Sequence, residues 1–150
     1  MKSLIIKYLE SVSELMKTQD ADKFYSWQLE NGQLFKKRDI RREKQLVAKG
    51  FAHKQKQCYY NSQMAMLNLG VNTVAKYYEG WYIPKNIPIP IEHGFLVEDG
   101  KVIDLTAKGE VREYFGVEIP MKFILQKINE TKMATALIFY YWNDVFYAKR

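Results

Sequence analysis

The sequence contains a single cysteine, Cys58, in 150 residues. One thiol cannot form a disulfide within the chain, which excludes the disulfide-stapled class of small secreted proteins and favours a reducing compartment. The chain also lacks any run of about 18 apolar residues, the length that a membrane-spanning helix requires. The apolar stretch near its start is interrupted by Lys7, and no small-residue cleavage site follows. We therefore expect a cytoplasmic protein with no membrane partner.

Motifs that bind metals or nucleotides are also missing. The two histidines, His53 and His93, are widely separated, and no second cysteine completes the paired spacing that a zinc site needs. The eight glycines are scattered and form no phosphate-binding loop. The sequence therefore predicts neither a metal nor a cofactor.

The composition is that of one folded domain over residues 1–150, with 47% hydrophobic and 27% charged residues. We divide it into a helical, basic part at 1–57, a catalytic-type core at 58–106, and a C-terminal helix and aromatic segment at 107–150. The net charge of +6 comes from the first part, which has thirteen Lys and Arg against seven acidic residues. Its densest stretch, residues 36–56, is either a solvated helix face or a surface that binds nucleic-acid phosphates or acidic partners.

Hydrophobic periodicity and turn residues predict a mixed α+β fold. Helices are predicted at 3–17, 39–49, 58–69, 108–115 and 121–130. A strand is predicted at 73–83 with a bulge at Gly80, and extended chain at 116–120. Hairpins are predicted within 24–37, around Asn31-Gly32, and within 90–106, around Asp99-Gly100. The aromatic segment 133–147 is compatible with helix or strand.

The second hairpin has a geometric consequence. If the Asp-Gly pair at 99–100 forms its two-residue turn, side chains alternate between the two faces of the paired strands. His93 and Asp104 then lie diagonally on one face with Cβ atoms about 7–8 Å apart, a gap that a side-chain hydrogen bond can close. Phe95 and Val97 share that face, so we expect it to be buried against a helix.

These residues suggest a thiol active site. A carboxylate bonded to one ring nitrogen fixes the tautomer of a histidine and leaves the other nitrogen to activate a nucleophile. Cys58 opens the predicted helix 58–69, whose N-terminus favours a thiolate. In this interpretation Cys58 attacks, His93 transfers the proton and Asp104 orients His93. The structural alternatives are a small buried cysteine, a hydrogen-bonded core histidine and an aspartate that caps the following helix.

Further residues complete the predicted site. The backbone N–H of Cys58 is the expected oxyanion donor, and Gln55 or Gln57 would supply a side-chain amide. Among the aromatic residues nearby, Trp81 is the candidate for lining the substrate groove. Each of these side chains also has an ordinary structural role available, in solvent for the glutamines and in the core for the tryptophan.

The order of these residues resembles the transglutaminase-like branch of the papain-like cysteine enzymes. In that branch a cysteine opens a helix, a Gly-Ile-Pro-like turn follows the helix, and the next strand ends in a Gly-aromatic pair. Two further strands carry His-Ala-Trp and Asp-Pro-Thr. The matching stretches here are Cys58, "LGVN" at 69–72, "EGWY" at 79–82, "HGF" at 93–95 and "DLT" at 104–106. The resemblance covers 58–106 and departs from the pattern at Gly94-Phe95 and at Leu105.

The resemblance implies an α+β fold in which the cysteine-bearing central helix packs on an antiparallel sheet that carries the histidine and the aspartate. It also implies a thiol-dependent hydrolase or acyltransferase that acts on an amide or peptide-type bond through a Cys58 thioester. The substrate would be a peptide, a protein or a small amide. Two alternatives remain open: a nucleic-acid-binding protein that uses residues 36–56, and a catalytically inactive family member that acts as an adaptor.

Overall fold

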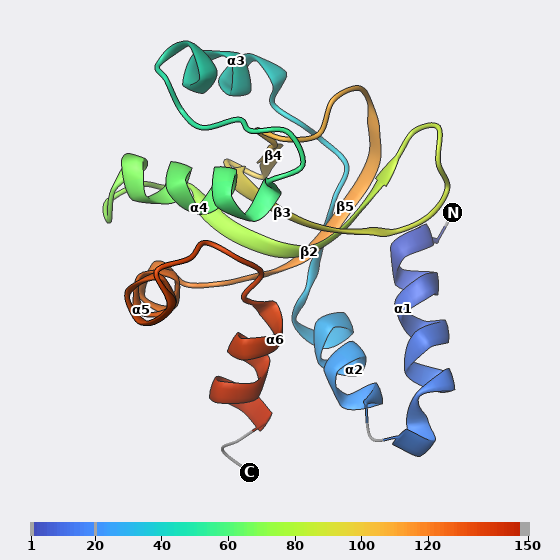
Figure 1. The fold of residues 1–150 in the computed structure, drawn as a ribbon. Helices are drawn as coiled ribbons and strands as arrows, with labels where there is room; N and C mark the ends of the chain where they lie inside the picture. The colour runs from blue at the N-terminus through green and yellow to red at the C-terminus, as the bar shows by residue number, and fades with distance from the viewer. Residues whose placement is uncertain (1, 20, 148–150) are drawn as a thin grey trace.

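The computed structural model describes residues 2–19 and 21–147. Helices surround one antiparallel sheet (Figure 1). In chain order the elements are α1 (Leu4–Leu15), α2 (Asp22–Asn31), β1 (Gln33–Phe35), α3 (Ile40–Ala48), α4 (Cys58–Leu69), β2 (Lys76–Pro84), β3 (Ile91–Glu98), β4 (Lys101–Ile103), β5 (Val111–Glu118), α5 (Met121–Thr131), α6 (Ile138–Tyr141) and a π-helical turn (Trp142–Tyr147). Within the described part of the chain, every helix is too short or too polar to cross a bilayer.

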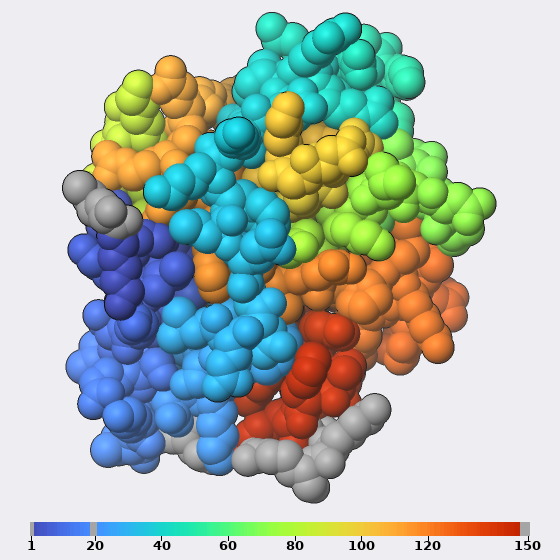
Figure 2. All heavy atoms as spheres, turned by 180° about the vertical axis from the view of Figure 1, so that it is seen from behind, coloured from blue at the N-terminus to red at the C-terminus, as the bar shows by residue number. Residues whose placement is uncertain are grey.

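The sheet is curled so that its two edges are linked. The strand order is β1-β5-β2-β3-β4, and all neighbours are antiparallel. After β1 the chain crosses to the opposite edge, where the N–H of Asp39 donates to the carbonyl of Val102 at 2.8 Å and the N–H of Val102 donates to the carbonyl of Lys37 at 2.9 Å. From behind, the light-blue chain after β1 adjoins the gold β4 hairpin (Figure 2).

The two faces of the curled sheet pack differently, because successive residues of a strand point to opposite sides. The inner face is closed by a cluster of buried side chains: Phe35, Tyr78, Phe95, Val97, Val102 and Tyr114. On the outer face, Tyr77 and Leu96 pack with α4 and α5. Trp81 and Ile83 pack with α1 further along the same face. The helices therefore form an outer layer around a small aromatic core.

The helix predictions at 3–17, 39–49, 58–69 and 121–130 are confirmed. The side chain of Ser3 accepts from the N–H of Ile6, and that of Asp39 accepts from the N–H of Arg42, so each of these N-cap residues satisfies a first-turn amide. Gly70 ends α4 at φ 87°, a left-handed conformation that glycine adopts without strain. In the aromatic segment 133–147, the helical alternative is correct from Ile138 onwards, whereas residues 133–137 form neither helix nor strand.

The predicted hairpin within 24–37 is wrong, because residues 22–31 form α2 and only the residues after Gly32 are extended. Phe24, Trp27 and Asn31 follow a helical spacing, and the side-chain amide of Asn31 donates to the carbonyl of Trp27 at 2.9 Å. Trp27 is buried against Val117 and Trp142. Tertiary burial of this helical face therefore outweighs the turn tendency of Asn-Gly.

The predicted helix at 108–115 is also wrong. Residues 111–118 form β5, which lies between β1 and β2 and pairs with both. Tyr114 lies in the inner cluster, whereas Phe115 lies on the outer face, so the chain follows a period of two. The bulge predicted at Gly80 is absent, since β2 keeps its register there and shifts only between Ile83 and Pro84.

A buried carboxyl group joins β2 to the C-terminal segment. Glu79 is 1% exposed and accepts the N–H of Leu137 at 2.8 Å, the N–H of Ile138 at 2.9 Å and the hydroxyl of Tyr77 at 2.6 Å. Burial raises the pKa of Glu79 to about 7, and these donors offset that effect only in part. The folded protein therefore binds a proton at Glu79 in a range where the unfolded chain has released it.

This difference predicts a pH-dependent stability. Because the folded pKa is raised, the contribution of Glu79 is fully present below pH 4.5 and is lost as the pH rises through about 7. Relative to Glu79→Gln, the wild type should lose about 2–3 kcal/mol of unfolding free energy across that interval, measured by urea denaturation. Glu118→Gln changes an exposed carboxylate, so its free energy of unfolding should depend on pH as that of the wild type does. A Glu79→Gln variant with that same pH dependence would contradict the prediction.

Candidate active site

His93 and Asp104 form a buried pair at the open end of the inner core. Asp99 and Gly100 have φ of 53° and 76°, as a type I′ turn requires, and the predicted register of β3 and β4 is confirmed. The Nε2 atom of His93 lies 2.8 Å from Oδ2 of Asp104, and the two residues are 3% and 2% exposed. The diagonal geometry expected from the hairpin therefore produces a direct hydrogen bond.

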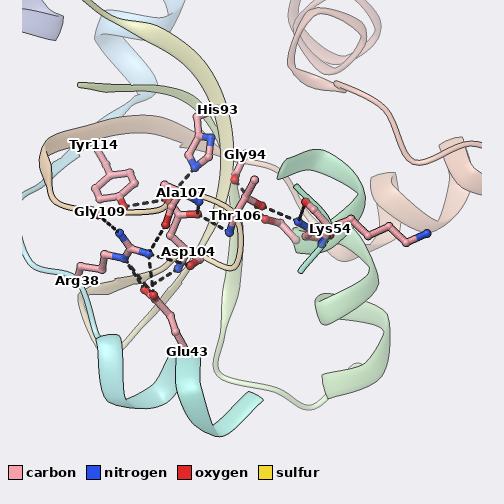
Figure 3. Close-up of polar contacts among 12 residues, drawn as sticks. Arg38, Glu43, Lys54, His93, Gly94, Asp104, Thr106, Ala107, Gly109 and Tyr114 are labelled. Carbon is pink, nitrogen blue, oxygen red and sulfur yellow. Dashed lines mark hydrogen bonds and ion pairs between the residues drawn. The ribbon is translucent and has the colours of Figure 1, made fainter. Parts of the chain in front are cut away.

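Both oxygens of the Asp104 carboxylate are engaged (Figure 3). Oδ2 also accepts the hydroxyl of Tyr114 at 2.9 Å, while Oδ1 accepts the N–H groups of Thr106 at 3.0 Å and Ala107 at 2.9 Å. Burial raises the pKa of Asp104, but the charge and hydrogen bond of His93, with the two N–H donors, outweigh burial and hold it well below its usual range. Asp104 is therefore a fixed carboxylate anion.

The same pairing keeps His93 protonated. Burial lowers the pKa of His93, but the charge and hydrogen bond of Asp104, with a smaller contribution from the neighbouring Cys58, outweigh burial and raise it to about 9. The stabilisation from protonated His93 is fully present below its ordinary pKa of 6.5 and is lost as the pH rises through about 9. At neutral pH the site contains an imidazolium held by a carboxylate.

An Arg38–Glu43 ion pair supports the backbone around Asp104. The Nε atom of Arg38 donates to Glu43 at 2.8 Å, and the Glu43 carboxylate accepts the N–H of Asp104 at 2.9 Å. Arg38 also donates to the carbonyl of Ala107 at 2.7 Å (Figure 3). The sequence analysis missed both residues, although Glu43 is one of two acidic residues in the basic stretch 36–56 and could have suggested a structural ion pair.

Cys58 is the first residue of α4 and is half-buried. Helix α4 approaches β3 closely, because the hydroxyl of Ser62 donates to the carbonyl of Gly94 at 3.2 Å and a Cβ at Gly94 would lie 2.8 Å from the Tyr59 ring. Gly94 directly follows His93, so this contact brings the start of α4 to the histidine. Cys58 and His93 share the lining of a cleft of about 350 Å³.

The structure corrects one detail of this arrangement. The face of β3 that carries His93, Phe95 and Val97 was expected to be buried against the cysteine-bearing helix. It faces the inside of the curled sheet, where Phe95 and Val97 pack with β1 and β5 side chains. Helix α4 covers the opposite face, and its first turn meets His93 at the rim. The curl of the sheet, which no local sequence pattern encodes, produces this geometry.

Asn61 fixes the chain that leads into α4. Its side-chain amide donates to Thr106 Oγ1 at 2.7 Å and to the carbonyl of Lys54 at 2.8 Å, and its Oδ1 accepts the N–H of Lys54 at 2.8 Å. Asn61 is fully buried and lies one turn after Cys58. One side chain therefore ties the loop before Cys58 to the segment that follows Asp104. The sequence analysis missed this residue, because its partners are distant in the chain.

Of the other predicted site residues, only Gln55 lines the cleft that contains Cys58. Gln57 is exposed, is not among the cleft residues and makes no side-chain cap to α4. Trp81 lies outside the cleft: it is buried on the outer face of the sheet, where its Nε1 donates to Gln28 at 2.9 Å. The aromatic residue of the cleft is Tyr82, whose ring centroid lies 4.2 Å from that of His93.

The arrangement is suited to nucleophilic chemistry. A cation held beside a thiol favours the thiolate, and the free N–H groups of a helix N-terminus favour negative charge on a bound oxygen. Among the described residues, no group of three or more His, Cys, Asp and Glu side chains could hold a metal ion. Comparisons of the chain with models of protein families, with curated proteins and with solved structures find no match.

Proposed function

We propose that the protein is a thiol-dependent hydrolase or acyltransferase that acts on an amide or peptide-type bond, with a Cys58–His93–Asp104 triad on a papain-like, transglutaminase-like core. The observation that carries the proposal is the buried His93–Asp104 hydrogen bond at the cleft that contains Cys58. Asp104 occupies Nε2 of the ring, which leaves Nδ1 for the thiol. The curled antiparallel sheet with α4 against β3 supports the proposed core.

The mechanism follows from these positions. The Cys58 thiolate attacks the carbonyl carbon and forms a C–S bond, while protonated His93 gives its proton to the leaving nitrogen as the C–N bond breaks. Water then attacks the thioester, His93 takes a proton from the water, and the C–S bond breaks to release the acid and the thiolate. An amine in place of water gives acyl transfer. The N–H of Cys58 and the amide of Gln55 are the candidate donors to the oxyanion.

Cys58 should be unusually reactive in the folded protein. We expect iodoacetamide at pH 7 to alkylate the wild type at least about tenfold faster than His93→Gln, because loss of the imidazolium removes the charge that favours the thiolate. The rate is measured by mass spectrometry of the intact protein. Treatment with p-nitrophenyl acetate should place an acetyl group on Cys58 in the wild type, which tests acyl chemistry directly.

The chain offers a matched control. His53→Gln removes the other histidine, which is exposed and bonded to the carbonyl of Phe51, and it should leave the alkylation rate unchanged. If wild-type Cys58 reacts rapidly only after denaturation, the thiol is structural. In that case the proposal fails, and the protein is a catalytically inactive binding or adaptor protein.

A further inference from the structure

A second, larger groove adjoins the cleft that contains Cys58. It has a volume of about 790 Å³ and lies between α3 and the segment that runs from Asp104 to Val111. Thr106, Ala107 and Lys108 line both the groove and the cleft. A chain bound at Cys58 can therefore continue over this shared segment towards α3, beside the loop that carries Ala107 in Figure 3.

The charges in the groove are not balanced. Its acidic side chains already have cationic partners: Glu43 pairs with Arg38, Glu110 with Lys85, and Asp104 with His93. Lys44 and Lys108 are exposed, and neither forms an ion pair with any residue that the structure describes. Both ammonium groups are thus available to a bound anion. Lys44 belongs to the stretch 36–56, which contains nine Lys and Arg but only two acidic residues, and Lys44 has no role in the proposed triad chemistry.

The floor of the groove is apolar and not aromatic. Leu105 is buried, and Ile40 and Val47 extend the apolar surface along α3. No Phe, Tyr or Trp side chain is among the described residues that line it, so the stacking platform that single-stranded nucleic acids use is absent there. A groove that presents both aliphatic surface and ammonium groups is complementary to a peptide in which acidic residues flank an aliphatic one.

We propose that this groove binds an acidic segment of a peptide or protein substrate, with carboxylates at Lys44 and Lys108 and an aliphatic side chain on the floor between them. Its place in catalysis rests on the proposed function, because the groove continues from the cleft of Cys58. Binding itself needs no turnover. The substrate class is thereby narrowed to polypeptides that carry acidic residues on one side of the bond that is attacked.

The test uses the full chain with Cys58→Ala, so that binding is measured without acyl transfer. The probe is a short fluorescein-labelled peptide with glutamates on both sides of one leucine, and the readout is fluorescence anisotropy. The affinity should fall steeply as salt is added. Adding Lys44→Glu and Lys108→Glu should weaken binding by about tenfold, whereas Lys122→Glu, an exposed charge on α5 outside the groove, should leave it unchanged.

Each outcome is decisive. A matched peptide with glutamines in place of the glutamates should bind at least about tenfold more weakly, and equal affinity would overturn the proposal. If Lys122→Glu weakens peptide binding as much as the groove variant does, the effect comes from the net charge of the protein, and the proposal is overturned as well. If a labelled single-stranded oligonucleotide binds more tightly than the glutamate peptide, and the same lysine variants abolish that binding, the groove is a nucleic-acid site and the peptide proposal fails. The proposed function is tested separately by the reactivity of Cys58, so the two failures are distinguishable.

Discussion

Asp104→Ala is expected to lower the free energy of unfolding at pH 7 by about 3–5 kcal/mol, the range for removing one partner of a buried ion pair. The carboxylate neutralises protonated His93 and accepts the hydroxyl of Tyr114 and the N–H groups of Thr106 and Ala107. Without it, these donors lose their partner in a site where little water enters, and His93 must give up its proton. Urea denaturation of the wild type and the variant measures the difference.

Two comparisons isolate the charge of Asp104. Asp104→Asn keeps the shape and one acceptor, so it should lose less stability than alanine while still abolishing the imidazolium. Asp144→Ala removes a partly exposed partner of Lys127 and should cost about 1 kcal/mol or less. The loss of unfolding free energy caused by Asp104→Ala should become smaller as the pH falls below 3.8. The pKa of Asp104 is lowered in the folded protein, so its stabilisation is lost as the carboxylate takes up a proton. A loss at pH 7 no greater than that of Asp144→Ala would show that the pair is not held as an ion pair.

The hairpin and the histidine pair were predictable because they depend on local rules. An Asp-Gly turn sets the register, the register fixes which side chains share a face, and the His93–Asp104 contact follows from that face. The start of α4 at Cys58 was predictable from the helical run that ends at Gly70. These parts of the site involve pairing between neighbours in the chain or within one helix.

The remaining features depend on contacts between distant segments. The curl of the sheet places the chain after β1 against β4 and brings Arg38 and Glu43 to Asp104, more than 60 residues away in sequence. Trp81 was expected to line the substrate site near Cys58, yet its position in β2 places the side chain against α1, outside the cleft that contains Cys58. Residues 108–115 were predicted as helix because the strands that pair with residues 111–118 could not be identified. Tertiary pairing, rather than local propensity, decided each of these cases.

The supporting contacts give the candidate site its rigidity. Asp104 is held through its carboxylate and through its backbone, which donates to Glu43 and accepts from Arg38. Asn61 ties the chain before Cys58 to Thr106, so one network positions the segments that carry Cys58 and Asp104. A histidine–aspartate pair that is fixed by buried contacts loses little entropy when a substrate binds. This preorganisation is the reason to expect reactivity from Cys58 in the resting protein.

Gly80→Ala should be the most damaging single-methyl change in the chain, with a loss of about 4 kcal/mol or more of unfolding free energy. A Cβ at Gly80 would lie 2.1 Å from the carbonyl oxygen of Phe115 and 2.6 Å from the Cα of Gly116. Both obstacles are backbone atoms of β5, so no side-chain rotation relieves the contact. The curled sheet must open between β2 and β5, which pair at seven positions.

The comparison that tests this explanation uses the other glycines. Gly116→Ala meets its nearest backbone atom at 2.9 Å and should cost less than Gly80→Ala. Gly109→Ala has open space around it but a φ of 79°, so it should cost only about 1–2 kcal/mol through backbone strain. Equal losses at the three positions, measured by urea denaturation, would mean that glycine flexibility and not strand proximity matters. Because Gly80 pairs directly with His93, the close approach of β2 and β5 that excludes a methyl group also helps to set the position of His93 in the candidate site.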